Sequence, residues 1–392
     1  MIQKNKINIL CILVGLAWFL IFNTTYASEK EKHVLFISSY NPNVETFSDQ
    51  IEGIQSGINE DVNLQIEYMD SRTFLGEENK EKFYELLKHR LRDQKGYDAV
   101  ILGDDQAFEF GMEHRDELFK NTPIIFLGVS SNNNIELAKK SKLVYGVTEP
   151  QSIKENIDLI RKLHKNKDIT IVTDAYSNSL NLDYNLDVLK KEFKDTKFNL
   201  ISLKDMSFEE LKKKLKTLGD NDVLFVMYAY RDKLGNVKSI KGSYELISES
   251  INVPIYSTMN YGIECGFIGG KVVSHTEQGK AAGKIAKEIL NGHQPKEKII
   301  DGNKIDNYIF DYNKLKFHNI NIKKLPNDSQ VVNSPIDTLY KYKEMVYGYL
   351  SLTISLLIVI ASLILYTVKK NKLSKRVNNS KRNSREYAKI TK

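Results

Sequence analysis

One uncharged stretch near the carboxyl terminus, Met345 to Val368, limits what this chain can fold into more than any other feature. It holds 24 consecutive residues without an acidic or basic side chain, and most of them are leucine, isoleucine or valine. At about 1.5 Å per residue a helix of this length spans roughly 36 Å, which exceeds the hydrocarbon core of a bilayer. A buried helix of a soluble domain is the alternative, but such helices rarely stay apolar on every face for so long. The stretch therefore predicts a transmembrane helix over 345–368.

The charges on either side of this stretch predict its orientation. Residues 369–392 contain ten Lys or Arg and one Glu, a net charge of +9. Basic segments beside a membrane helix tend to stay in the cytoplasm, so the residues before 345 are expected outside. Subtracting +9 for the tail and +2 for Lys4 and Lys6 from the chain's +7 leaves −4 for the remainder. The basic character belongs to the chain ends, which predicts contact with anionic lipid headgroups at the membrane and no nucleic-acid partner.

The amino terminus has the pattern of a secretory signal. Two lysines precede an apolar run of 16 residues, 7–22, and small residues follow up to a possible cleavage position after Ala27. An uncleaved anchor is the alternative, although about 24 Å of helix is short for a stable span. We favour cleavage, and both interpretations put residue 30 outside the cell.

The exported part, residues 28–344, must be stabilised by its hydrophobic core. Cys265 is its single cysteine, because Cys11 lies in the amino-terminal apolar run, so no internal disulfide can form. Its 317 residues are too many for one ordinary core and suit two domains.

Short apolar runs alternate with stretches of helical spacing throughout this part. The runs are continuous rather than alternating, as expected for strands buried on both faces. Strands are expected at 33–39, 64–69, 97–103, 123–129, 143–148, 169–173, 198–203, 222–228, 254–259 and 269–274. Strand followed by helix in this order predicts parallel sheets with right-handed crossovers, in two similar α/β units. The small residues Gly279, Ala282, Gly283 and Ala286 on an expected helix over 276–290 indicate close packing of that helix.

Several motifs resemble a known family. They are VLFISSY (34–40), LGDDQA (102–107), GGKVVS (269–274), EQGKAA (277–282), FDYNKL (310–315), LPNDS (325–329) and NSP (333–335). Together they are similar to the type I periplasmic-binding-protein fold, in the branch of ABC-transporter substrate-binding-like proteins used as extracytoplasmic sensor domains of bacterial receptors. The resemblance covers about residues 32–345.

The resemblance implies two Rossmann-like lobes with parallel sheets, joined by a hinge of three segments. Lobe 1 is expected to hold about residues 32–143 and 276–296, and lobe 2 about 149–270 and 311–330. The crossings are expected near 143–149, 270–276 and 297–311. The predicted order is then a signal peptide or anchor (1–27), the two-lobed ligand-binding domain (28–344), one transmembrane helix (345–368) and a basic cytoplasmic tail (369–392).

The ends of the strands nominate a binding site. Ligands of such sheets bind beyond the carboxyl ends of the strands, here where the two lobes face each other. Hydroxyls, carboxylates and aromatic faces at these ends can hold a small polar molecule. From the first lobe the candidates are Ser38, Ser39, Tyr40, Asp104, Asp105, Gly128 and Ser130. From the second lobe they are Asp174, Tyr176, Tyr228, Tyr230, Thr258, Asn260 and Tyr261.

Several candidates have a structural alternative. Asp105 could cap the helix that follows it, and Ser38 and Ser39 could satisfy only backbone groups at the end of their strand. A tyrosine at a strand end can equally be a packing residue. Arg231 could bind a ligand carboxylate through its fork of donors, or it could pair with Asp232 beside it.

No recognisable catalytic or metal-binding pattern occurs in the sequence. The seven histidines are scattered without an HExxH pair, there is no GxSxG sequence, and the glycines over 262–270 match no phosphate-binding or dinucleotide-binding fingerprint. We therefore expect a binding protein without enzymatic activity, cofactor or metal. An extracytoplasmic enzyme on the same scaffold is the least favoured alternative.

A hinged cleft predicts closure on a ligand that touches both lobes. We expect a membrane-anchored extracytoplasmic sensor that closes on a small polar ligand. Its signal is expected to pass through a partner, such as a kinase, or a missing output domain, because the 24 residues of the tail contain no His and no Asp. The alternative is the substrate-binding component of an ABC importer, with a permease as partner. The resemblance suggests an amino acid or related metabolite as the ligand, but no residue selects among such compounds.

Protease added to cells with an exposed plasma membrane is expected to digest residues 28–344 and to spare the tail, 369–392. Immunoblotting with antibodies against each part measures this. Lysed cells are the control, because there both parts should be degraded. Survival of the 28–344 part on intact cells would contradict the predicted topology.

Overall fold

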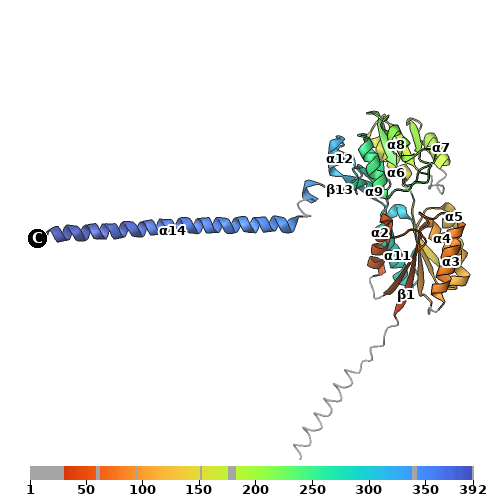
Figure 1. Cartoon of the computed structure of the whole chain (residues 1–392), viewed down its shortest axis with the longest axis horizontal. Coiled ribbons are helices and arrows are strands. Elements are labelled where there is room, and N and C mark those ends of the chain that lie inside the picture. Colours follow the sequence, from red (N-terminus) through yellow and green to blue (C-terminus); the bar gives the residue numbers. More distant parts are fainter. Residues whose placement is uncertain are drawn as a thin grey trace, which may run out of the picture. The chain divides into compact units, whose positions relative to one another are not determined.

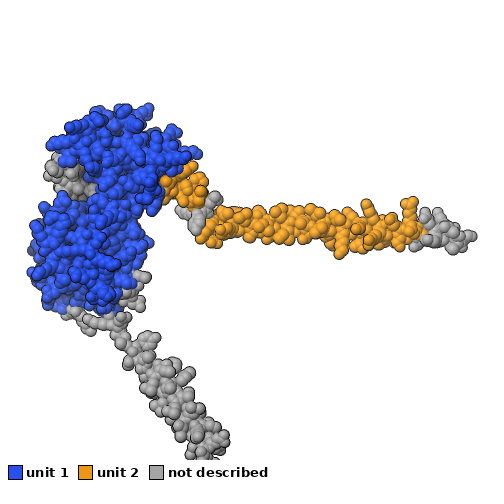
Figure 2. Space-filling model, turned by 180° about the vertical axis from the view of Figure 1, so that it is seen from behind, with its two compact units in different colours: residues 1–310, 314–330 blue, residues 311–313, 331–392 orange. Residues whose placement is uncertain are grey.

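The computed structural model describes residues 31–58, 62–92, 96–150, 152–174, 182–337 and 342–390, with the main chain alone at 182–185 and 384–390. It divides into two compact units, one of residues 1–310 with 314–330 and one of residues 311–313 with 331–392 (Figure 2). The expected signal peptide or anchor, 1–27, lies outside the described residues, and so does the candidate Tyr176.

The first lobe of the large unit is built on a sheet of six parallel strands in the order β11-β5-β4-β3-β1-β2. The strands are β1 (Lys32–Ser38), β2 (Val62–Tyr68), β3 (Ala99–Gly103), β4 (Ile124–Val129), β5 (Val144–Thr148) and β11 (Ile299–Ile300). The helices are α2 (Glu45–Ile58), α3 (Glu77–Leu91), α4 (Asp104–Glu113), the π-helix η1 (Arg115–Phe119), α5 (Asn132–Lys140) and α11 (His275–Leu290).

Helices cover both faces of this sheet, as its continuous apolar strands require. Val34 and Phe36 of β1 belong to one buried cluster, shared with residues of α2 and α11. Leu35 and Ile37 belong to another, shared with residues of α3 and α4. In Figure 1, α2 and α11 accordingly lie on one side of the sheet and α3, α4 and α5 on the other. Two-sided burial leaves the carboxyl ends of the strands as the polar edge of the lobe.

The contact between α2 and α11 requires glycine. A Cβ atom on Gly57 would lie 2.3 Å from the main-chain oxygen of Lys280, and one on Gly283 would lie 2.4 Å from that of Ile54. Main-chain atoms cannot rotate out of the way as a side chain can. The helices therefore pack backbone to backbone, as the small residues on the second of them indicated.

The second lobe has a sheet whose strands within the large unit follow the order β12-β10-β9-β8-β6-β7. The strands are β6 (Asp168–Thr173), β7 (Phe198–Ser202), β8 (Asp222–Val226), β9 (Ile255–Ser257), β10 (Gly269–Val272) and β12 (Asn307–Asp311). The helices are α6 (Ile153–Leu163), α7 (Leu182–Glu192), α8 (Phe208–Leu215), α9 (Ile240–Ser250), α10 (Tyr261–Glu264), η2 (Gly302–Lys304), α12 (Tyr312–Phe317) and η3 (Ile322–Lys324). The prediction of two α/β lobes with parallel sheets is confirmed, with β12 added antiparallel to β10.

The chain passes three times between the two sheets. It leaves the first sheet after β5, returns after β10 through 273–274, and leaves again after β11 through 301–306. Since β5 is itself a strand of the first sheet, the first passage starts at the end of the predicted segment 143–149. The connecting segments lie close together, because the Ser152 hydroxyl donates to Asp306 at 2.9 Å and Glu149 Oε2 lies 3.6 Å from Nε2 of His275, which follows the second passage.

The small unit contains the long carboxyl-terminal helix. It begins within β13 (Gln330–Val332) and ends with α14 (Lys343–Ile390). Of the described helices, α14 alone is long and apolar enough, over Lys343–Asn383, to cross a membrane. Its large apolar side chains are exposed, for example Leu365 at 70%. An apolar surface of this extent needs lipid or protein to cover it.

Gly57→Ala and Gly283→Ala are each expected to lower the free energy of unfolding by about 1–3 kcal/mol, because the added methyl group has to push two helix backbones apart. Urea unfolding of the full chain in detergent micelles measures the loss. Gly219→Ala is the matched control, since a Cβ there meets no atom within 4 Å. Equal stability of all three variants would contradict the backbone-to-backbone contact.

Candidate functional site

A cavity of about 460 Å³ lies between the two lobes, at the carboxyl ends of their strands. It is lined by Tyr40, Val44, Thr46, Arg72, Leu75, Asp104, Asp105, Gln106, Glu109, Gly128, Ser130, Ser131, Glu149, Asp174, Tyr228, Tyr230, Arg231, Ile240, Met259 and His275. Both lobes and the passages between them contribute side chains. The lining combines carboxyl groups, two arginines, hydroxyls and aromatic rings, so it can hold a polar molecule of metabolite size.

The structure brings together eight of the residues nominated from the sequence. They are Tyr40, Asp104, Asp105, Gly128, Ser130, Asp174, Tyr228 and Tyr230. Each stands at or just after the carboxyl end of a strand, as parallel topology requires. Gly128 has a φ of +72° and sits against Asp104, because a Cβ there would lie 2.5 Å from Asp104 Oδ1.

Ser38 and Ser39 are fully buried and do not line the cavity. The Ser39 hydroxyl donates to the main-chain oxygen of Gly103 at 2.6 Å and accepts from the amide of Ala107 at 2.8 Å. The Ser38 hydroxyl accepts from the amide of Tyr40 at 3.1 Å. Both hydroxyls therefore serve the backbone, which is the structural alternative given for them.

Three candidates of the second lobe lie outside the cavity lining. Thr258 is buried, and its main-chain oxygen accepts from the amide of Val273. Asn260 precedes the short helix α10. The Tyr261 hydroxyl donates to the carboxylate of Asp49 on α2, so this tyrosine joins the two lobes.

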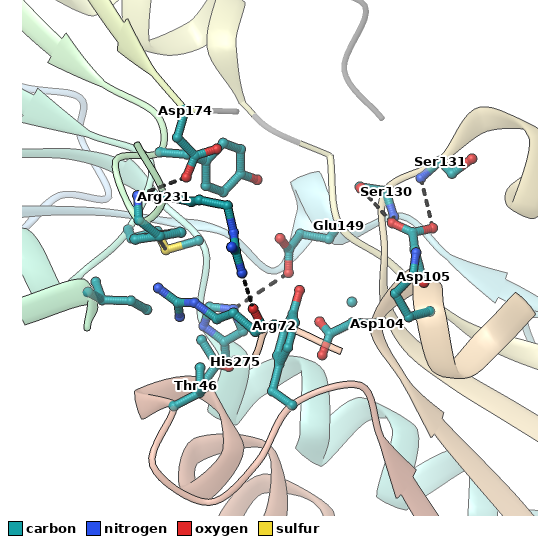
Figure 3. Close-up of a pocket in the computed structure, with 18 of the residues that line it drawn as sticks. Thr46, Arg72, Asp104, Asp105, Ser130, Ser131, Glu149, Asp174, Arg231 and His275 are labelled. Atoms are coloured by element: carbon teal, nitrogen blue, oxygen red, sulfur yellow. Dashed lines mark hydrogen bonds and ion pairs between the residues drawn. The ribbon is translucent and has the colours of Figure 1, made fainter. Parts of the chain in front are cut away.

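Asp105 organises the loop that follows β4. Its carboxylate accepts from the amide and hydroxyl of Ser130, at 3.1 and 2.8 Å, from the amide of Ser131 at 3.1 Å and from the Asn134 side chain at 2.8 Å. The interpretation that Asp105 caps its own helix is wrong, because the cap position of α4 is Gly103 and no side chain bonds there. Asp105 instead accepts hydrogen bonds from residues at the start of α5 and so supports that helix (Figure 3).

Two arginines connect the lobes across the cavity. Arg72 Nη2 donates to the main-chain oxygen of Lys238 at 3.0 Å, and its guanidinium lies 4.2 Å from the centre of the Tyr230 ring. Arg231 Nη2 in turn donates to the main-chain oxygen of Arg72 at 2.7 Å. Asp232 is not the partner of Arg231, because its carboxylate accepts from the amides of neighbouring residues, including Leu234 at 3.0 Å.

Asp104 is a buried carboxyl group in an uncommon backbone conformation. Its φ of +69° lies in the left-handed region, and the residue is 7% exposed. The Gln50 amide donates to it at 3.1 Å. Burial raises the pKa of Asp104 to about 7, an effect that outweighs the Gln50 hydrogen bond, and the charge of Asp105 raises it further. Near neutral pH this side chain can therefore gain or lose a proton.

Glu149 and His275 form a second buried pair. Glu149 Oε2 lies 3.6 Å from His275 Nε2. Burial lowers the pKa of His275 to about 4, so its imidazole is neutral near pH 7. Burial, and then the charges of Asp104 and Asp306, raise the pKa of Glu149 well above its usual range. Burial thus favours the uncharged form of both side chains.

Several lining residues are not among the candidates nominated from the sequence. Arg72 follows β2, Glu149 follows β5 and Met259 follows β9, so the strand-end rule applied to every strand finds all three. Thr46 lies in the first turn of α2, where no strand end marks it. In the part of the chain that the structure describes, no three His, Cys, Asp or Glu side chains gather as they would to hold a metal ion.

Comparison with known proteins identifies a family. The profile described as ABC transporter substrate binding protein matches residues 49–328, more than half of the chain. Curated protein sequences provide no match.

Solved structures share the fold. They include the ligand-free, open form of a substrate binding protein with adhesive properties from Clostridium difficile (16% identity, TM-score 0.54, covering 77% of this chain and 99% of that one). An ABC domain from Streptococcus pneumonia in complex with L-Trp has 18% identity and a TM-score of 0.54, covering 76% and 99%. A conserved domain protein from Vibrio cholerae has 13% identity and a TM-score of 0.55, covering 77% and 99%. The resemblance to type I periplasmic binding proteins is thereby confirmed for the fold.

Asp104→Asn is expected to be more stable than the parent at about pH 8, by about 1–3 kcal/mol. The parent's folded state retains a proton up to about pH 7 that its unfolded state loses near the usual aspartate pKa. The stability contributed by Asp104 is thus present below that lower pKa and is lost as the pH rises through about 7. Asparagine does not titrate, and it tolerates a positive φ.

Urea unfolding at several pH values measures the difference, which should shrink toward about pH 4. Asp116→Asn is the matched control, because Asp116 is exposed on η1 and should show no such pH dependence. A stability difference for Asp104→Asn that does not change with pH would contradict the raised pKa.

Proposed function

Because the chain belongs to the family of ABC transporter substrate-binding proteins, we propose that it is a membrane-anchored extracytoplasmic solute-binding protein that closes on a small polar ligand. The observation that carries the proposal is the cavity between the lobes, lined by hydrogen-bonding and aromatic side chains from both. A ligand in that position contacts both lobes at once, so it favours the closed arrangement by its differential affinity.

Closure is supported by hydrogen bonds that cross the cleft. Besides the two arginines, the amide of Lys241 on α9 donates to Glu45 Oε1 on α2 at 3.0 Å. Separation of the lobes would break these bonds and expose the cavity. A hinge of three segments suits such a motion, because each segment has to change only a few backbone angles.

The lining supports an amino acid or related metabolite as the ligand. Tyr40, Tyr228 and Tyr230 offer ring faces, and carboxyl groups and guanidinium groups both occur in the lining. A zwitterion with an apolar side chain can use all three kinds of group. One structural relative holds L-Trp, a compound of this class.

The chain around α14 supports a role in signalling. An exposed apolar helix of this length, followed by a strongly basic stretch, suits a single membrane span with the lobes outside the cell. Residues 333–344 join the lobes to that span. We propose a sensor that signals through a partner such as a kinase or through an output domain. The second candidate, favoured by the family match, is the substrate-binding component of an ABC importer with a permease partner.

Thermal unfolding of the full chain in detergent micelles, screened against a metabolite library, tests the proposed binding. A compound at 100 times its dissociation constant adds about 2.7 kcal/mol to stability. Tyr40→Ala should remove most of this gain, since Tyr40 lines the cavity. Tyr68→Ala is the matched control, because Tyr68 is 48% exposed on β2 and lies outside the lining. If no library compound raised the unfolding temperature, or if Tyr40→Ala left the gain intact, the proposed cleft function would be refuted.

The compound found in this way also separates the two roles. Deletion of the chain should abolish uptake of the labelled compound if the protein serves an importer. Uptake should persist if the protein is a sensor, with the cell's response to the compound lost instead.

A further inference from the structure

Three polar atoms in the cavity wall have no hydrogen-bond partner within the described residues. They are Thr46 Oγ1, Glu149 Oε2 and His275 Nδ1. Their residues are 4%, 6% and 3% exposed, so bulk water does not reach them freely. Buried polar atoms of folded proteins are nearly always hydrogen-bonded, and leaving one unpaired is costly. All three residues line the same cavity, so a molecule bound there can supply partners to them.

The charge of the cavity indicates which kind of partner is missing. Its lining contains five carboxyl groups, on Asp104, Asp105, Glu109, Glu149 and Asp174, against two arginines. The arginines already donate to main-chain oxygens of the surrounding loops. In Figure 3 the carboxyl groups of Asp104 and Glu149 point toward the middle of the cavity. The wall around Glu149 thus presents acceptors and negative charge in excess of the cations beside it.

An ammonium group matches this arrangement. It carries three N–H donors, no acceptor and one positive charge. A carboxylate, a hydroxyl and a neutral imidazole nitrogen are acceptors, and a carboxylate bound to an ammonium group gives a charge-assisted hydrogen bond. A carboxylate or sulfate of a ligand would instead lie beside carboxyl groups, whose negative charge repels it once they are ionised.

We propose that Thr46, Asp104, Glu149 and His275 form a subsite for a primary ammonium group of the ligand. This assignment rests on the proposed function, since it names the chemical class that the cleft selects. The ligand is an amine, and the rest of the cavity, with its tyrosines and arginines, recognises the remainder of the molecule.

The charges around the subsite support the assignment and make it testable by pH. Glu149 is faced by His275 and the Gln278 amide of α11, by Asp104 and Asp105 of α4 and by Asp306 of the third passage. Burial raises the pKa of Asp104 to about 7 and raises the pKa of Glu149 well above its usual range. An ammonium group has to displace these protons, so binding should release protons and strengthen as the pH rises through the pKa of Asp104.

A panel of matched compounds provides the probes. Phenylalanine is compared with phenethylamine, which lacks the carboxylate, and with phenylpropionate, which lacks the ammonium group. Leucine, isoamylamine and isocaproate form a second set, and the other common amino acids complete the panel. Thermal unfolding and calorimetric titration of the full chain in detergent micelles are expected to show binding of ammonium compounds and none of the matched acids.

Glu149→Gln is the central variant. Glutamine has the same shape as the protonated acid and does not titrate, so without a probe the unfolding temperature should not fall, and above the usual glutamate pKa it should rise. Affinity for the ammonium probes should fall roughly tenfold or more, because a charge-assisted hydrogen bond is lost. Glu277→Gln is the matched control on the same helix as His275, since the Glu277 side chain is 45% exposed and pairs with Lys280. If the Glu149 variant does not fold, proton release by the parent in buffers of different ionisation enthalpy replaces it.

The outcomes separate this inference from the proposed function. Binding of the matched acids as strongly as the amines, unchanged affinity in Glu149→Gln, or affinity for amines that does not rise with pH would overturn the ammonium subsite. The same holds if library compounds without an ammonium group bind in a Tyr40-dependent way while every amine of the panel fails at millimolar concentration. In that case the cleft function stands and the subsite assignment falls.

Discussion

The close contact between α2 and α11 is the interaction on which the rest of the structure depends. Helix α11 follows β10, a strand of the second lobe, yet its glycines pack against α2 of the first. This contact covers one face of the first sheet and obliges the chain to cross between the lobes. The crossings then bring Glu149 and His275, distant in sequence, to the base of one cavity. Packing of the core and assembly of the site are therefore consequences of the same helix.

Burial is what gives the cavity its chemistry. Asp104 and Glu149 would be ordinary anions on a surface, but their withdrawal from water favours the protonated forms. Asp105, one residue further on, keeps its carboxylate occupied with four donors of the next loop. Two neighbouring aspartates thus have different tasks, one supporting the wall and one facing the interior.

Much of the architecture could be predicted from the sequence, because strands buried on both faces appear as continuous apolar runs and alternate with helical spacing. Strand ends also identified Tyr40, Ser130 and Asp174 as lining residues. The antiparallel β12 and the contribution of Thr46 could not be predicted, since both depend on tertiary contacts without a local signal. The direction of a side chain at a strand end is equally hidden, and for this reason Ser39 was nominated although its hydroxyl is bonded to the backbone.

The hydrogen bonds that Arg72 and Arg231 make across the cleft respond to pH differently from the carboxyl groups inside it. Their acceptors are main-chain oxygens, and a guanidinium retains its proton under all physiological conditions. These hydrogen bonds between the lobes therefore do not depend on pH. The bond from Arg72 does not depend on the side chain at position 238 either, because its acceptor is the main-chain oxygen. Acidification would protonate Asp104 inside the cleft while the hydrogen bonds of the two arginines persist. A ligand could then lose affinity without separation of the lobes.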